Sequence, residues 1–225
     1  MPRIFVPSSG PGDWRCLLAD PEKHWARRRS ARTLAHCWED TDGFPPEVQV
    51  VLNQHPALAG AVPLLIFPEW KVPLPGGSTS SQNDAWVLAK SQDDLISITV
   101  EGKVEEPFDR TLAEWKADAS PGKAKRLAFL EETLGLTSAI PDTVRYQLVH
   151  RTASAVIEAQ RFGAKHAVMF VHSFSHNDEW HNDFAGFVAL FGRNAEIGQL
   201  VSASASRGLP LHFAWVHGDE RFLNA

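Results

Sequence analysis

Three charged residues near the middle of the chain have the types and the spacing of a metal-dependent phosphodiesterase site. Asp84 begins one strand-like run, and Glu101 and Lys103 end the next. Two carboxylates can hold a hard divalent cation such as Mg²⁺ through oxygen ligands. A lysine beside them can orient a water nucleophile or neutralise the charge that develops on a phosphate. These residues therefore predict hydrolysis of phosphodiester bonds.

The two runs that carry these residues are predicted to form a β-hairpin. Residues 95–104 alternate between apolar and polar and are rich in β-branched side chains, and residues 91–94 are typical of a turn. Glu101 and Lys103 share one face of the strand because alternate residues point the same way. The opposite face is apolar and is expected to meet the core. Since the first strand starts where the second ends, Asp84 is expected near the same tip.

The acidic residues also carry a resemblance to a known group of enzymes. Asn83-Asp84 with Glu101-Gly102-Lys103 resembles the PD-(D/E)xK signature of the restriction-endonuclease-like nuclease superfamily, with Asn83 in place of the usual Pro. The wider sequence resembles a group of uncharacterised bacterial proteins related to that superfamily. The resembling segments are residues 17–25, 71–77, 81–84, 100–104 and 145–153. The resemblance implies the fold more strongly than the activity, because the superfamily includes members that have lost catalysis.

The resemblance also implies roles for particular residues. Asp84 and Glu101 would hold Mg²⁺ or Mn²⁺, and the main-chain carbonyl of Gly102 would complete the metal's shell. Lys103 would activate or orient the attacking water. In the superfamily a helix after the motif strands often contributes a polar residue, commonly Gln or Lys, and Gln147 is our choice for that catalytic role.

Two more charged residues are candidates for the same site. Arg151 follows Gln147 by one helical turn and offers a bidentate fork for phosphate oxygens. An alternative is that both side chains satisfy backbone groups beside the Pro-Gly-rich loop of residues 73–84, which is expected to deliver the first acid. Glu69 follows an apolar strand-like run and is expected close to that loop. It is either an additional metal ligand or a structural or exposed carboxylate.

The composition is that of one globular protein. The chain has 225 residues, of which 44% are hydrophobic and 22% charged, so it can bury a full core. We predict a single restriction-endonuclease-like domain with a helical extension over about residues 1–58. No apolar run approaches the roughly 20 residues of a membrane span, and the first ten residues lack the apolar segment of a signal peptide. Cys16 and Cys37 lack metal-binding spacing, so a cytoplasmic protein with reduced thiols is expected.

The charge balance weakens the expectation of duplex DNA as the substrate. The chain carries 22 basic and 27 acidic residues, whereas proteins that bind nucleic acid usually show a basic footprint. Residues 24–32 form one basic cluster, and a second set comprises Lys116, Lys123, Lys125 and Arg126. Each set either grips phosphates or is a solvated helix face. Nucleic acid remains the predicted substrate, while its type and the formation of a homodimer stay open.

The elements around the motif predict an α/β protein with a restriction-endonuclease-like mixed sheet flanked by helices. Ser30 and Ser120 are the expected N-caps of two helices. Helices are predicted near residues 14–19, 30–40, 44–54, 120–135, 143–162 and 183–191. Strands are predicted near residues 61–67, 84–90, 95–104, 165–173 and 210–217.

A second set of potential metal ligands lies in residues 172–183. It comprises His172, His176, Asp178, His181 and Asp183. Imidazoles and carboxylates can bind Zn²⁺ or Mn²⁺. The segment has no HExxH-type spacing, so a solvated loop in which Asp178 caps a helix is the preferred interpretation.

Two functional hypotheses result. The first is a Mg²⁺-dependent hydrolase that cleaves nucleic acid through Asp84, Glu101, Lys103 and Gln147. The second is a catalytically inactive member of the same fold that serves as a binding or assembly module.

Overall fold

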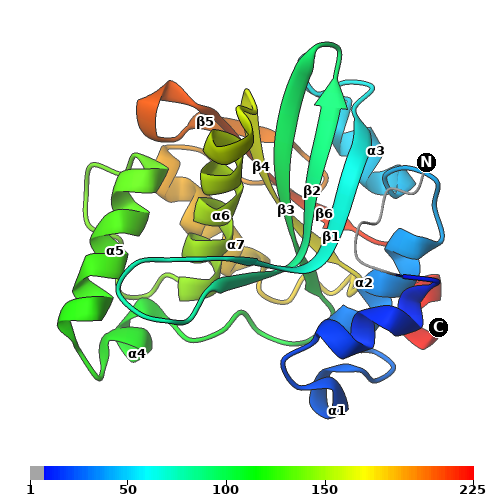
Figure 1. Ribbon diagram of the computed structural model, residues 1–225, viewed down its shortest axis with the longest axis horizontal. Coiled ribbons are helices and arrows are strands. Elements are labelled where there is room, and N and C mark those ends of the chain that lie inside the picture. Colours follow the sequence, from blue (N-terminus) through cyan, green and yellow to red (C-terminus); the bar gives the residue numbers. More distant parts are fainter. Residues whose placement is uncertain (1–7) are drawn as a thin grey trace.

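The computed structural model describes residues 8–225, which form a six-stranded mixed sheet between two groups of helices (Figure 1). The predicted class, a mixed α/β sheet flanked by helices, is confirmed. Of the expected helical extension over about residues 1–58, residues 1–7 lie outside the described residues. The strands are β1 (Val62–Val72), β2 (Ser81–Ser91), β3 (Asp94–Lys103), β4 (His166–Ser173), β5 (Val201–Ser204) and β6 (Pro210–His217).

The strands run in the order β1-β2-β3-β4-β6-β5 across the sheet. β1, β2 and β3 form an antiparallel meander, β3, β4 and β6 are parallel, and β5 returns antiparallel to β6. The predicted hairpin is confirmed, since Ser91 pairs with Asp94 across a two-residue turn. The carboxyl ends of β3, β4 and β6 therefore meet at one edge of the sheet.

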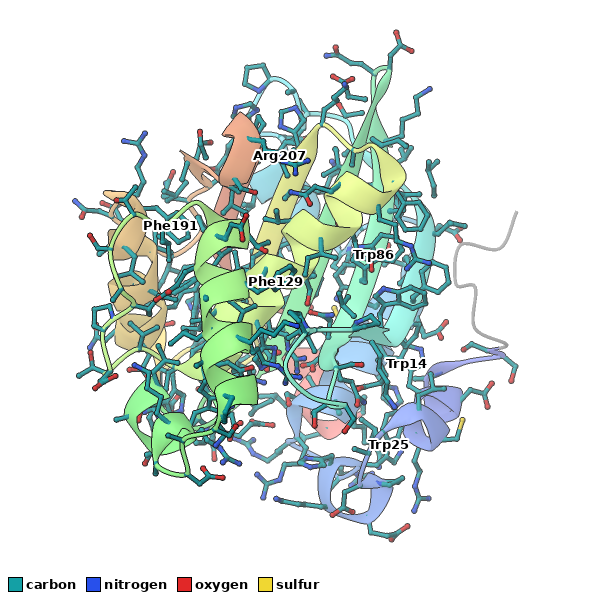
Figure 2. The ribbon with its side chains drawn as sticks, turned by 60° about the vertical axis from the view of Figure 1, so that its left-hand side comes forward. Trp14, Trp25, Trp86, Phe129, Phe191 and Arg207 are labelled. Atoms are coloured by element: carbon teal, nitrogen blue, oxygen red, sulfur yellow. The ribbon has the colours of Figure 1, made fainter. Side chains whose placement is uncertain are left out.

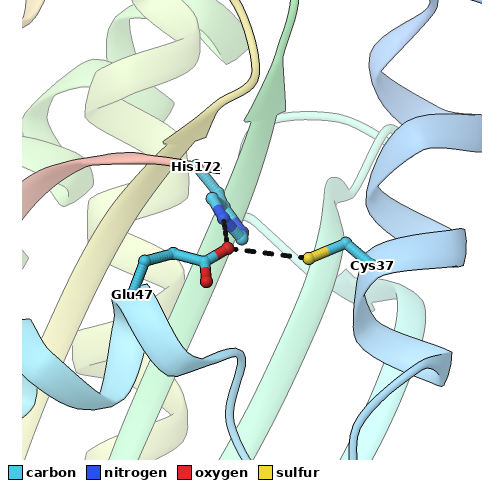
Figure 3. A group of neighbouring side chains, drawn as sticks. All are labelled: Cys37, Glu47 and His172. Atoms are coloured by element: carbon cyan, nitrogen blue, oxygen red, sulfur yellow. Dashed lines mark hydrogen bonds and ion pairs between the residues drawn. The ribbon is translucent and has the colours of Figure 1, made fainter. Parts of the chain in front are cut away.

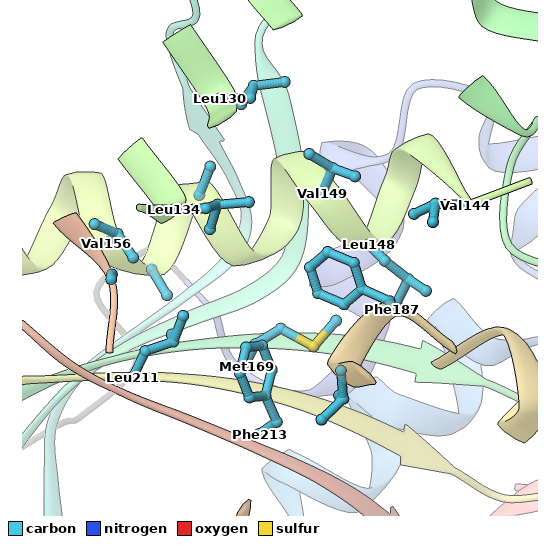
Figure 4. Packing of buried hydrophobic residues seen from close by; sticks show 14 of the residues in the cluster. Leu130, Leu134, Val144, Leu148, Val149, Val156, Met169, Phe187, Leu211 and Phe213 are labelled. Atoms are coloured by element: carbon cyan, nitrogen blue, oxygen red, sulfur yellow. The ribbon is translucent and has the colours of Figure 1, made fainter. Parts of the chain in front are cut away.

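One face of the sheet is covered by four helices of the second half of the chain. They are α4 (Leu112–Lys116), α5 (Pro121–Leu134), α6 (Tyr146–Phe162) and α7 (His181–Val188). Figure 4 shows Val149 and Val156 of α6 above Met169 of β4 and Phe213 of β6, all fully buried. Complete burial of one such side chain contributes roughly 1.5–3 kcal/mol. The apolar side of α6 therefore fixes this helix on the sheet.

The opposite face is covered by the N-terminal helices. The helices that pack on it are the 3₁₀ helix η1 (Pro11–Leu17) and the α-helices α2 (Ser30–Glu39) and α3 (Pro46–Leu52), while α1 (Pro21–His24) contacts η1 and α2 and buries no residue. Leu34 and Trp38 of α2 pack in one cluster with Ile98 and Val100 of β3. The expectation that this face of β3 meets the core is confirmed. Further 3₁₀ helices are η2 (Ala189–Phe191), η3 (Ser206–Gly208) and η4 (Glu220–Asn224).

Aromatic rings cover the sheet beside the end of α6. Trp86 of β2 stacks with Phe162, with ring centroids 5.1 Å apart, and with Trp70 at 5.5 Å (Figure 2). Trp86 also donates its indole N–H to Ser97 at 2.9 Å. These rings therefore cover the polar face of β2 and β3 near the end of α6. The charged residues Asp84, Glu101 and Lys103 lie toward the other end of that face.

Two helix boundaries differ from the sequence prediction. Ser30 is not an N-cap but the first residue of α2, and its N–H donates to Oε1 of Glu106 at 2.8 Å. The longest helix begins at Tyr146, later than predicted, because Leu112 donates its N–H to the carbonyl of Val144 at 2.8 Å. The predicted cap of α5 is confirmed, since the side chain of Ser120 accepts the N–H of Lys123.

The loop between β1 and β2, residues 73–80, crosses to the amino-terminal end of α5 (Figure 1). Gly76 has a φ of +80°, and a Cβ added to it would lie 2.0 Å from the carbonyl oxygen of Gly122. Only glycine fits this contact, because the backbone is left-handed and no space exists for a side chain.

Among residues 8–225, none of the helices combines the length and the apolarity that a membrane crossing requires.

Candidate functional site

Three carboxylates lie in a row across three neighbouring strands. Ala85 pairs with Val100, which sets Asp84 of β2 opposite Glu101 of β3. The register of β1 with β2 sets Glu69 opposite Asp84 on the other side. Asp84 was predicted to begin its strand at the end of the loop of residues 73–84, but β2 already begins at Ser81, so Asp84 lies inside the strand. The expected closeness of Glu69 to the first acid is confirmed.

Glu101 is the centre of the hydrogen-bond network, and its side chain is only 2% exposed. Its Oε1 accepts from Lys103 Nζ at 2.8 Å and from Gln147 Nε2 at 2.6 Å. Its Oε2 accepts from Arg151 Nε at 2.7 Å. Lys103 lies on the same strand face as Glu101, as alternation requires. Three donors, two of them cationic, therefore hold this carboxylate in one orientation.

Asp84 is held at the tip of β3. Its Oδ2 accepts the N–H of Gly102 at 2.8 Å, and its Oδ1 lies 3.5 Å from Nη2 of Arg151. One guanidinium thus contacts the carboxylates of both Asp84 and Glu101. The structure brings the two acids together.

Helix α6 supplies the polar residues above the strands. Gln147 and Arg151 are four positions apart, so they project from the same side of the helix. Besides its contact with Glu101, the side chain of Gln147 accepts from Lys103 Nζ at 3.3 Å and from the N–H of Asp109 at 3.1 Å. In the structure both α6 residues contact the charged centre and not the loop of residues 73–80.

Glu69 stands slightly apart from the other acids. Its backbone is left-handed, with a φ of +52°, which is uncommon for a residue with a side chain. Its Oε2 accepts from Nε2 of Gln82 at 2.7 Å. Gln82 was not among the predicted site residues. It lies two positions before Asp84, so strand alternation is the signal that could have placed it on the same face.

The charges of this centre do not balance. Burial and the charge of Glu101 raise the pKa of Asp84 to about 7. Burial and the charge of Asp84 raise the pKa of Glu69 to about 8. Burial opposes the ionisation of Glu101 as well, but Lys103 and Arg151 outweigh it and lower the pKa of that carboxyl. Asp84 and Glu69 are therefore the acids that the two cations do not compensate, and each keeps a proton up to its raised pKa.

The charged centre opens into a cavity of about 970 Å³. Its walls include the segment that follows β3, the start of α6 and part of the N-terminal helical region. The ligand oxygens of Glu69, Asp84 and Glu101 do not all lie within 4.8 Å of one another, so they do not form a compact triad among the described residues. Asp84 and Glu101 are the two neighbouring carboxylates that could share a ligand here, with Glu69 nearby.

A different group of potential ligands is compact. One ligand atom each of Cys37, Glu47 and His172 lies within 4.8 Å of the others (Figure 3). His172 Nε2 is 2.9 Å from Oε1 of Glu47, and Cys37 Sγ donates to the same oxygen at 3.7 Å. This group was not predicted, because its members lie far apart in the chain.

The surroundings of His172 argue against a metal in this group. Trp38 Nε1 donates to His172 Nδ1 at 3.2 Å. An indole N–H can only donate, so Nδ1 must accept and the ring proton lies on Nε2, facing Glu47. A histidine that binds a metal through one nitrogen normally donates from the other. Cys37, Glu47 and His172 are therefore a hydrogen-bonded part of the core.

The remaining ligands of residues 172–183 do not converge. His217 Nε2 lies 2.6 Å from Oδ1 of Asp178, and the ring of His176 stacks on His217 at 4.5 Å. The predicted cap is wrong, because the residue before α7 is Trp180, not Asp178. Within residues 8–225, none of His176, Asp178, His181 and Asp183 belongs to a group of three ligand atoms within 4.8 Å.

No curated protein and no solved structure matches the chain. The model of one family, described as Domain of unknown function (DUF6946), matches residues 7–220. This match spans most of the chain, and the protein belongs to that family.

Proposed function

We propose that this protein is a Mg²⁺-dependent nuclease that hydrolyses phosphodiester bonds through a PD-(D/E)xK-type site on a restriction-endonuclease-like sheet. The observation that carries the proposal is the pairing of Asp84 with Glu101 across β2 and β3, beside Lys103 and Gln147, in one cavity. These are the residue types that such chemistry requires.

Each residue of the site would have a separate role in this hydrolysis. Asp84 and Glu101 would hold Mg²⁺ or Mn²⁺, with the carbonyl of Gly102 as a further ligand. When bound, the cation supplies Lewis-acid polarisation of the phosphate and a lowered pKa of the attacking water. Lys103, fixed by Glu101 and Gln147, would orient that water. The guanidinium of Arg151 would contact a phosphate oxygen after turning away from the carboxylates.

The uncompensated charge supports a cation at this place. Asp84 and Glu69 have raised pKa values because like charges are buried together. A divalent cation would favour the ionised forms of both groups. Glu69 would then lie beside the metal as an additional ligand.

Nucleic acid is the proposed substrate, and a homodimer is the arrangement that would cut both strands of a duplex. A cytoplasmic location is part of the same proposal, in keeping with two free cysteines.

One observation favours the second candidate, a non-catalytic binding or assembly module. Both oxygens of Glu101 are already occupied by protein donors, and Arg151 partly neutralises both acids without any metal. A centre of this kind can be purely structural.

Calorimetric titration with Mg²⁺ and Mn²⁺, paired with a cleavage assay on labelled oligonucleotides, separates the two candidates. The variant is Glu101→Gln, because an alanine would leave Lys103 and Arg151 buried without a partner. Glu196→Gln is the matched control, since Glu196 is an exposed carboxylate outside the cavity. Metal binding and cleavage that vanish in Glu101→Gln alone support the nuclease. Cleavage that persists in that variant contradicts it, and wild-type protein that neither binds metal nor cleaves supports the module.

A further inference from the structure

The basic cluster near the N-terminus forms one wall of the candidate active-site cavity. Lys23 and His24 end α1, and Arg29 directly precedes α2. All three side chains are exposed, and all three line the cavity that contains Glu101 and Lys103. We define Lys23, His24 and Arg29 as the basic wall. Residues 23–29 and residues 101–103 are far apart in the sequence, so the fold is what places the basic wall beside Glu101 and Lys103.

The basic wall is fixed to the rest of the cavity. Arg28, in a left-handed backbone conformation, donates its N–H to the carbonyl of Leu223 at 2.9 Å. Its Nη2 pairs with Oε1 of Glu105 at 3.1 Å. The N–H of Ser30 donates to Glu106. Since residues 105 and 106 follow β3 directly, the wall is held at a constant position relative to the carboxylates.

The cations of the wall lack acidic partners, in contrast to most of the second basic set. Lys116 pairs with Asp142 at 2.6 Å, and Lys123 pairs with Asp118. Arg126 donates to the carbonyl oxygen of Pro75 at 2.9 Å. Within residues 8–225, no carboxylate lies within 4.0 Å of the charged nitrogens of Lys23 or Arg29. The wall is therefore the better place for an incoming anion.

The depth of the charged centre restricts the shape of that anion. Glu101 is 2% and Lys103 is 3% exposed, so the groups that would act on a phosphate lie at the bottom of the cavity. A stiff duplex rests on a surface, whereas a single strand bends and can lower one phosphate into a recess. From the wall and the depth together, we infer that Lys23, His24 and Arg29 bind the backbone phosphates of a single nucleic-acid strand whose scissile phosphate enters this cavity. The inference rests on the proposed nuclease function.

The test measures binding without cleavage. Fluorescence anisotropy in EDTA follows a short labelled single strand and the blunt duplex of the same sequence over a series of salt concentrations. The variant is Lys23→Gln/Arg29→Gln. The matched control is Lys165→Gln/Arg207→Gln, which removes two exposed cations elsewhere. Arg207 lies at the opposite end of the molecule from Trp25, which follows α1 (Figure 2).

The expected result is tighter binding of the single strand, with a salt dependence that falls in the wall variant alone. Each phosphate contact contributes roughly 0.7 to the slope of log K against log salt for single strands, so two lost contacts lower it by about 1.4. An equal slope in wild type and wall variant overturns the inference. Tighter binding of the duplex, no binding at all, or equal displacement by polyglutamate overturns it as well. Salt-dependent binding through the wall without any cleavage would support the role of the wall and contradict the nuclease function. Cleavage with an unchanged slope in the wall variant would support the nuclease function and contradict the role of the wall.

Discussion

Arg151 and Glu101 form an ion pair at 2.7 Å, and both side chains are almost completely buried. The guanidinium remains charged at any pH that a protein tolerates, so the pair keeps Glu101 ionised inside the protein. Such a pair is a weak source of net stability, but loss of one partner leaves a buried charge and costs about 3–5 kcal/mol. Arg151 therefore stabilises the two carboxylates and, at the same time, would compete with any cation for the same oxygens.

This competition predicts that Arg151→Gln binds Mg²⁺ more tightly than wild type. Removal of the guanidinium leaves the carboxylates of Asp84 and Glu101 with less positive charge, so the free energy of unfolding without metal falls by about 3–5 kcal/mol. Added Mg²⁺ recovers part of this loss. Calorimetry and urea unfolding measure both effects. Lys125→Gln, an exposed cation on α5 outside the cavity, serves as the control. Equal Mg²⁺ affinity in Arg151→Gln and wild type would count against a cation between these acids.

The raised pKa of Asp84 predicts that stability falls with pH. The ordinary value is 3.8, and in the folded protein it is about 7. The folded state therefore holds a proton that the unfolded state has released between these two values. As a result, the free energy of unfolding decreases from about pH 4 to about pH 7.

The variant Asp84→Asn removes the contribution of Asp84 to this dependence, because an amide does not titrate, while Glu69 keeps its own contribution. We expect its Tm to exceed that of wild type at pH values above the folded pKa, by ~2–4 °C for each kcal/mol gained. Saturating Mg²⁺ should raise the wild-type Tm and leave that of Asp84→Asn nearly unchanged. Scanning calorimetry over a pH series measures both. The raised pKa of Asp84 would be refuted if the wild-type Tm rose between pH 4 and pH 7 and the Tm of Asp84→Asn followed the same course.

A pair of glycine variants tests the crossing loop. Gly76→Ala is expected to destabilise the protein by more than about 1 kcal/mol, because its φ is +80° and the new Cβ would collide with Gly122. Gly186→Ala is the control, since Gly186 lies in α7 with open space around it. That change should stabilise by roughly 0.5–1 kcal/mol. Urea unfolding compares the two, and a neutral Gly76→Ala would disprove the close contact.

The two cysteines should differ in reactivity. Cys16 is exposed, whereas Cys37 is buried, and burial together with the charge of Glu47 raises the pKa of its thiol. The thiolate is the reactive form, so iodoacetamide should modify Cys16 alone in the folded protein and both residues in urea. Peptide mass spectrometry reads the modified sites. Rapid native labelling of Cys37 would mean that the core around His172 opens readily.

Much of the motif could be predicted because its determinants are local. The two-residue turn after Ser91 and the strict alternation along β3 set Glu101 and Lys103 on one face and Asp84 beside them. Gln147 and Arg151 could be placed on one side of a helix by their spacing. A short strand such as β5, with two serines among its four residues, carries no comparable signal and was missed.

The contacts between distant segments could not be predicted. The bond from Arg151 to Glu101 and the group of Cys37, Glu47 and His172 depend on how helices dock on the sheet. No single-sequence periodicity encodes that docking. The caps of α2 and α7 were mispredicted for the same reason, since Glu106, far along the chain, accepts the first N–H of α2.

The parallel pairing of β3 with β4 also has a consequence for the order of folding. β1, β2 and β3 are joined by short connections, whereas β4 can pair with β3 only after residues 104–165 have been placed. Closure of such a long intervening segment is entropically costly and slow. Because Arg151 lies in that segment, the meander must first bring its three acids together without their strongest cation. We therefore expect the charged centre to be the last part of the molecule to assemble.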